Sequence, residues 1–153
     1  MRIALVPAAL CALAACVLPA CGTTPPSRFY TLEALASAPD GGAARALAID
    51  VGPVVLDEAI DRPQMLTRLG ENEVALHELS RWAEPLDSNI ARVLAENLSL
   101  LTGSPDVGVV PDASTQMDSW NVTVHVLHCE AGPGGTARLV TRWRLFPPDA
   151  AQP

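Results

Sequence analysis

The sequence predicts a mixed fold of class α+β (or α/β), in which a mostly antiparallel sheet carries one long amphipathic helix on one face. Residues 87–102 place apolar side chains at spacings of three and four, which is the helical period. Residues 120–146 contain two runs that alternate between apolar and polar side chains and are joined by a glycine-rich turn, the pattern of a β-hairpin. We therefore expect a single domain over residues 29–146, a size that can bury a core.

The first twenty residues have the composition of an export signal. Arg2 supplies a positive start, and residues 3–20 carry no charge and are rich in alanine. We expect residues 1–20 to be removed as a lipoprotein signal peptide. The polar, proline-containing residues 21–28 then form a tether.

Two cysteines offer an attachment point for lipid. Leu13-Ala14-Ala15-Cys16 and Leu18-Pro19-Ala20-Cys21 both resemble the lipobox of bacterial lipoproteins. The motif is better at Cys16, but cutting there leaves a very short apolar region, so we expect acylation, including palmitate, at Cys21 with Cys16 as the alternative. Gly22 follows Cys21 where enteric bacteria use Asp to retain a lipoprotein in the inner membrane, which favours the outer membrane.

Several short strands precede the helix. Residues 29–32 favour a strand, and residues 36–45 read as a linker of alanine, glycine and proline. Residues 46–56 predict a strand with a bulge or edge at Pro53. Residues 64–68 and 73–79 flank the turn Leu69-Gly70-Glu71-Asn72 and predict a hairpin. Residues 106–110 predict another short strand.

The helix over residues 87–102 begins at Asp87, a good N-cap, and ends before Gly103 and Pro105. Its predicted buried face carries Ile90, Val93, Leu94, Leu98 and Leu101. The predicted solvent face carries Asn89, Arg92, Glu96 and Asn97. We therefore expect the helix to pack on one side only.

Charge and motifs exclude several functions. All ten basic residues are arginines, against 17 acidic residues, and the net charge of −7 argues against binding nucleic acid or anionic lipid by charge. His125 and His128 point to opposite faces of a strand, which argues against a metal site. Cys129 fits a buried structural thiol. Since no catalytic, cofactor-binding or phosphate-binding motif is present, we do not expect an enzyme.

Several motifs resemble the PqiC/YmbA-type family of ABC-transport auxiliary lipoproteins. The most specific are Asp61-Arg62-Pro63-Gln64-Met65-Leu66-Thr67-Arg68 and Arg81-Trp82-Ala83-Glu84-Pro85-Leu86-Asp87. Shorter matches are Ser27-Arg28-Phe29-Tyr30-Thr31-Leu32, Val51-Gly52-Pro53-Val54 and Arg92-Val93-Leu94-Ala95-Glu96-Asn97-Leu98. On this resemblance, the candidate docking residues are Arg62, Pro63, Arg81, Trp82, Glu84 and Pro85.

The resemblance implies a non-catalytic docking subunit at the periplasmic face of the outer membrane. Its partners would be an MCE-domain protein and the permease and ATPase of the same ABC system, which are implicated in lipid trafficking and envelope integrity. A homo-oligomer would match the ring symmetry of MCE proteins. The alternative is a periplasmic ligand-binding or envelope-assembly lipoprotein without an ABC transporter.

The residue types give Trp82 a second interpretation. A tryptophan is costly to expose, so burial in the core is favoured for Trp82, Trp120 and Trp143, as it is for Met65 and Leu66. Arg81 and Glu84 are expected to form a local ion pair before the helix.

The carboxy-terminal tail, residues 147–153, departs from the family pattern. Relatives usually continue into a further strand and a long helix, whereas here two prolines and a polar end follow Phe146. We expect the hairpin to leave an apolar surface exposed, which would promote self-association or dye binding. Its members would be Val122, Val124, Val126, Leu139, Trp143 and Leu145.

We predict that Cys21→Ala abolishes lipid attachment, because the thiol that carries the diacylglycerol is gone. Labelling cells with a radioactive fatty acid and fractionating them measures this directly. The protein should lose its label and leave the membrane or accumulate as precursor. Label that persists in Cys21→Ala but disappears in Cys16→Ala would assign the anchor to Cys16.

Overall fold

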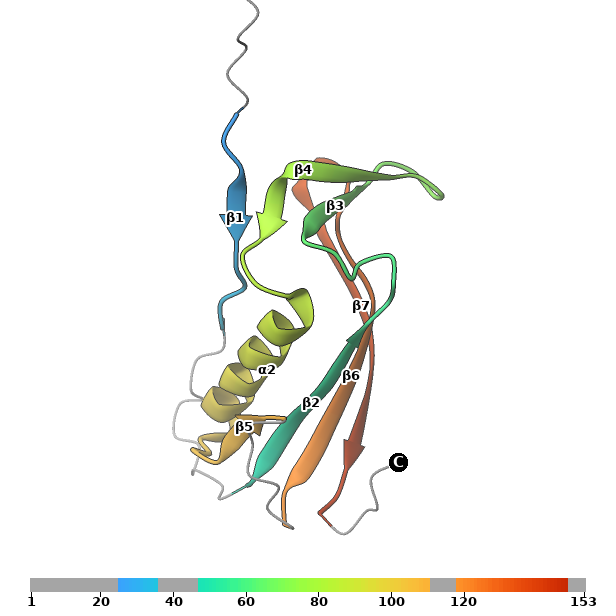
Figure 1. Cartoon of the computed structure of the whole chain (residues 1–153). Coiled ribbons are helices and arrows are strands. Elements are labelled where there is room, and N and C mark those ends of the chain that lie inside the picture. Colours follow the sequence, from blue (N-terminus) through green and yellow to red (C-terminus); the bar gives the residue numbers. More distant parts are fainter. Residues whose placement is uncertain (1–24, 36–46, 111–117, 149–153) are drawn as a thin grey trace, which may run out of the picture.

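The computed structural model describes residues 25–35, 47–110 and 118–148. The predicted signal peptide, Cys16, Cys21, the whole predicted linker (residues 36–45) and residues 149–153 lie outside them. All predicted strands are present (Figure 1). They are β1 (Arg28–Tyr30), β2 (Ile49–Leu56), β3 (Gln64–Arg68), β4 (Val74–Trp82), β5 (Val107–Val109), β6 (Trp120–Ala131) and β7 (Ala137–Phe146). The single described helix is α2 (Leu86–Thr102), and a short 3₁₀ turn, Pro133–Gly135, joins β6 to β7.

The strands form one mixed sheet in the order β1-β4-β3-β6-β2-β5, with β7 pairing only with β6. Four pairings are parallel, β1/β4, β2/β5, β2/β6 and β3/β6. Only the two hairpins, β3/β4 and β6/β7, are antiparallel. The expected mostly antiparallel sheet is therefore wrong. Hairpins join neighbours in the sequence and leave a turn signal, whereas the parallel pairings join distant segments that no local pattern connects.

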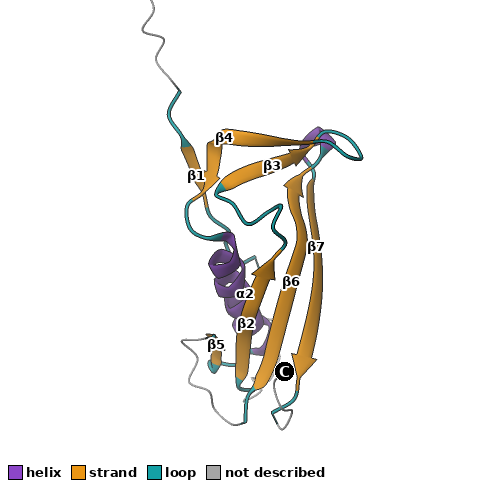
Figure 2. Ribbon diagram, turned by 45° about the vertical axis from the view of Figure 1, so that its right-hand side comes forward, coloured by secondary structure: helices purple, strands orange, loops and turns teal. Residues whose placement is uncertain are grey.

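The helix α2 packs on one face of the sheet, against β2 and β5 (Figures 1 and 2). It begins at Leu86, with Pro85 rather than Asp87 at the N-cap position, and ends at Gly103, whose φ of 66° is left-handed. Small residues make the closest contact, since Ala91 and Ala95 are buried with Ile49 and Val51. Leu101, expected in the core, is 54% exposed.

The hairpin β6/β7 is buried on one strand and exposed on the other. Val124 and Val126 of β6 lie in the core. The β7 residues on the same face of the sheet lie beyond the area that α2 covers. Trp143 is 67% exposed and Leu145 49%, so the expected burial of Trp143 is wrong. The expected apolar surface exists on β7 alone.

The β3/β4 hairpin joins the long strands through very few contacts. Only Thr67 and Ala131 pair as backbone partners between β3 and β6. Beside them the buried Glu130 carboxylate accepts hydrogen bonds from Arg68 at 2.9 Å and Arg138 at 3.0 Å. The hydrogen bond from Arg68 is the main reason that the pKa of Glu130 lies below its ordinary value. One carboxylate thus connects β3, β6 and β7.

The segment after β1 is held along the helix by side chains that we expected in solvent. Asn89 is fully buried, and its Oδ1 accepts hydrogen bonds from the Leu32 amide at 3.2 Å and from Arg92 at 3.0 Å. Two turns later Asn97 Oδ1 accepts the Leu35 amide at 3.1 Å. The predicted solvent position of Asn89 is wrong because residues 31–35 cover that side of α2.

We predict that Glu130→Gln lowers the free energy of unfolding at pH 7 by about 1 to 3 kcal/mol, because it removes charge-assisted hydrogen bonds at a buried position. Since the folded-state pKa of Glu130 is depressed, its contribution is complete above the unfolded-state pKa of about 4.3 and is lost as the pH falls through the folded-state value. Urea unfolding from pH 7 to pH 3 should show the two proteins converging in acid. A constant difference across this range would contradict the assignment.

Candidate functional site

Five of the six candidate docking residues lie around one cleft of about 390 Å³. Its lining consists of Asp61, Arg62, Pro63, Trp82, Ala83, Glu84, Pro85 and Leu86, and we call it the motif cleft. Arg81 does not line it. Asp61 and Leu86 do, and sequence reasoning had not singled them out, although both lie within the two quoted motifs.

Backbone hydrogen bonds bring the two motifs together. The Trp82 amide donates to the Pro63 carbonyl at 2.8 Å, where β4 passes the start of β3. The next amide, of Ala83, donates to the Tyr30 carbonyl at 2.8 Å. Segments around residues 30, 63 and 83 therefore meet at one end of the sheet, where the chain turns into α2 (Figure 1).

Glu84 joins the cleft to the helix rather than to Arg81. Its Oε1 accepts hydrogen bonds from Thr31 and from Arg92, both at 3.2 Å. Arg81 instead donates to the Glu78 carbonyl at 2.9 Å and pairs with the Glu78 carboxylate at 3.5 Å. The predicted Arg81–Glu84 pair is therefore wrong, because Arg81 pairs with Glu78 and Glu84 pairs with Arg92.

Arg62 retains hydrogen-bonding capacity. Its Nε atom is buried and has no hydrogen-bond partner in the described part of the chain. A buried donor without an acceptor costs about 1 to 3 kcal/mol, so an acceptor on a bound partner would relieve that cost. With Asp61 opposite in charge on the same rim, the cleft can recognise polar groups of both signs.

Trp82 lines two spaces. Besides the motif cleft it borders an apolar cavity of about 460 Å³ between the two hairpins and the start of α2. Met65, Leu66, Ile90, Cys129 and Leu139 also border that cavity. Trp82 is half-buried, between the core and anchor interpretations, and it borders both the cleft and the cavity.

The described residues hold neither a candidate metal site nor a thiol that favours its thiolate. They contain no group of three or more His, Cys, Asp or Glu that could hold a metal ion. Burial, followed by the nearby Glu130 charge, raises the pKa of the Cys129 thiol, which disfavours the reactive thiolate. In the same part of the chain, no helix has the length and apolarity needed to cross a membrane.

Comparisons with known proteins concern the family and the fold of this chain. A family model described as the ABC-type transport auxiliary lipoprotein component matches residues 30–153, which include both motifs. A crystal structure of a protein from Xanthomonas campestris is 14% identical, with a TM-score of 0.63 over 78% of this chain and 68% of that one. An uncharacterized protein is 15% identical, with a TM-score of 0.52 over 84% of both chains. A search of curated proteins finds no match. At these identities the two structures establish the fold alone.

We predict that Trp82→Ala lowers the free energy of unfolding by about 3 kcal/mol, the lower end of the range for tryptophan removed from a core, because the ring is half-buried. Trp143→Ala is the matched control and should change stability by less than about 0.5 kcal/mol, because Trp143 is exposed. Urea unfolding measures both. Equal losses in the two variants would show that Trp82 does not support the cavity wall.

Proposed function

Because the chain belongs to the family of ABC-type transport auxiliary lipoprotein components, we propose that it is the non-catalytic docking subunit of an MCE-type ABC transport system for lipids. The family match over residues 30–153 carries the proposal, since it spans both motifs of the cleft. The partners are an MCE-domain protein with its permease and ATPase. The Arg62 donor and the exposed rim of the motif cleft support docking rather than chemistry.

The proposed anchor places the motif cleft close to the membrane. If Cys21 is acylated at the periplasmic face of the outer membrane, six residues lie between it and Arg28 at the start of β1, which makes seven Cα–Cα steps. Fully extended, they span at most about 25 Å. Since Tyr30 of β1 contacts Ala83 at the cleft, the tether keeps this end of the domain near the membrane and lets the domain rotate.

Affinity purification from the native envelope tests the proposal. The acylated protein with a carboxy-terminal tag is captured in mild detergent, and mass spectrometry identifies the proteins bound to it. We expect an MCE-domain protein, a permease and an ATPase. A partner set without an ABC transporter would support the alternative of a ligand-binding or envelope-assembly lipoprotein, for which the apolar cavity supplies a binding space.

We predict that Arg62→Glu reduces recovery of these partners at least tenfold, because it replaces the donor in the motif cleft with a carboxylate. Arg28→Glu, an equal change of charge on the exposed strand β1, is the control and should retain them. Both variants should keep their fatty-acid label. If Arg62→Glu keeps its partners while its stability is unchanged, docking does not use the cleft.

A further inference from the structure

The outer edge of β7 is a long, unpaired strand edge in the described part of the chain. The strand has ten residues and pairs only with β6. The carbonyl and amide groups on its other side therefore have no sheet partner among the described residues. Such an edge is a template for another strand, and natural proteins usually shorten it, charge it or cover it.

One row of β7 side chains is apolar and exposed. Trp143 pairs across from the buried Val124, and Leu145 pairs across from Val122. These side chains share the helix side of the sheet, but α2 packs on β2 and β5, on the far side of β6. Among the described residues, no helix covers β7.

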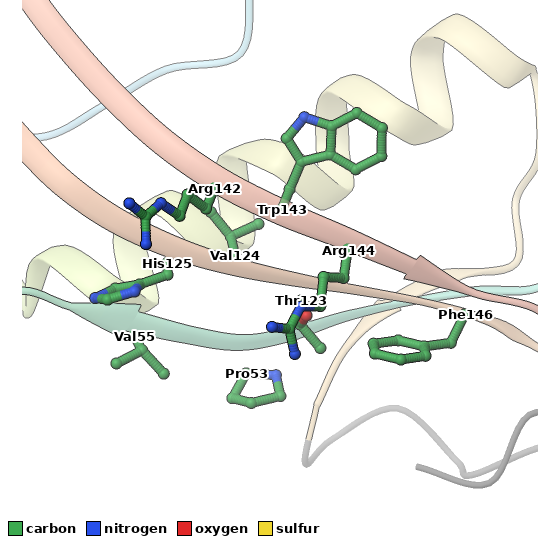
Figure 3. Close-up of a pocket in the computed structure, with 9 residues that line it drawn as sticks. All are labelled: Pro53, Val55, Thr123, Val124, His125, Arg142, Trp143, Arg144 and Phe146. Atoms are coloured by element: carbon green, nitrogen blue, oxygen red, sulfur yellow. The ribbon is translucent and has the colours of Figure 1, made fainter. Parts of the chain in front are cut away.

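The opposite row is cationic. Arg142 and Arg144 are exposed, and neither makes an ion pair or hydrogen bond to any described residue. They border a groove of about 590 Å³ whose lining contains no carboxylate. Figure 3 shows Trp143 directed away from Pro53, Val55 and Phe146, which lie on the groove side. In a chain with a net charge of −7, two unpaired arginines on one strand are a local reversal of charge.

We propose that the β7 edge binds an extended segment of a partner protein in which acidic and apolar side chains alternate. The segment adds to the sheet as a strand, so that its backbone pairs with the free edge. Strand geometry sends its acidic side chains to Arg142 and Arg144 and its apolar side chains to Trp143 and Leu145. This surface is separate from the motif cleft, and the proposal does not depend on the identity of the transport partner.

A second copy of the chain fits this edge poorly. A symmetric antiparallel pair centred on Trp143 would place Arg142 of one copy opposite Arg144 of the other, and like charges directly opposite are destabilising. The other sheet edges, β1 and β5, contain no carboxylate that could pair with the arginines. Among the described strand edges none supplies complementary charge, so we assign it to a different chain.

Peptide binding to the detergent-solubilised acylated protein tests the proposal. The probe is a fluorescein-labelled nine-residue peptide of alternating valine and glutamate, and binding is followed by fluorescence anisotropy. One control peptide has lysine in place of glutamate, and a second is N-methylated at every residue, which removes the backbone donors. We expect the glutamate peptide to bind at least fivefold more tightly than the lysine peptide, less so at high salt, and the methylated peptide not to bind.

Charge reversal in the protein separates recognition from folding. The double variant Arg142→Glu and Arg144→Glu should prefer the lysine peptide, a gain that an unfolded protein cannot show. Arg28→Glu should keep the wild-type preference. Equal binding of the glutamate and lysine peptides, or undiminished binding of the methylated peptide, would overturn the proposal. A dimer in sedimentation that blocks the glutamate peptide would assign the edge to a second copy instead.

Discussion

The buried carboxylate of Glu130 is the interaction on which the arrangement of the two hairpins depends. Only Thr67 and Ala131 pair along the backbone between β3 and β6, and beside them Leu66 packs in the core with Val124 and Val126. Arg68 and Arg138 approach the carboxylate from strands on either side. Separating the buried Glu130 carboxylate from both arginines would leave its charge uncompensated, which is costly. The two ion pairs therefore hold the hairpins at a defined angle. Glu130 and Arg138 themselves line the apolar cavity between the hairpins.

The motif cleft depends in turn on how the amino-terminal segment is fixed. Arg92 donates to the Leu32 carbonyl, to Glu84 and to Asn89, so one guanidinium joins the segment after β1, the turn before α2 and the helix itself. All three contacts are made by the Nη2 atom of Arg92, whose two N–H groups are shared among the acceptors. The residues of this junction come from parts of the chain that are about 50 residues apart.

Local patterns in the sequence were enough to predict the helix, both hairpins and the boundaries of most strands. The family resemblance, rather than any local pattern, pointed to five of the residues that line the motif cleft. What the local patterns could not predict depends on contacts between distant residues. Asn89 has a polar side chain on a helix and was placed in solvent, since nothing near it in the sequence shows that residues 31–35 cover it. The alternation of apolar and polar residues on β7 resembles that on β6, whose apolar residues are buried. Trp143 is nevertheless exposed, because α2 packs on β2 and β5, on the other side of β6.

The position of β6 in the chain determines when the fold can be completed. β6 contacts β2, β3 and β7 directly, but it begins only at residue 120 of 153. The strands that precede it therefore cannot form their shared sheet while the chain is still emerging, and the loops that must close are long. If the proposed signal peptide directs export from the amino terminus, late closure of the sheet is an advantage. Such a chain would reach the far side of the membrane before β6 could join the other strands.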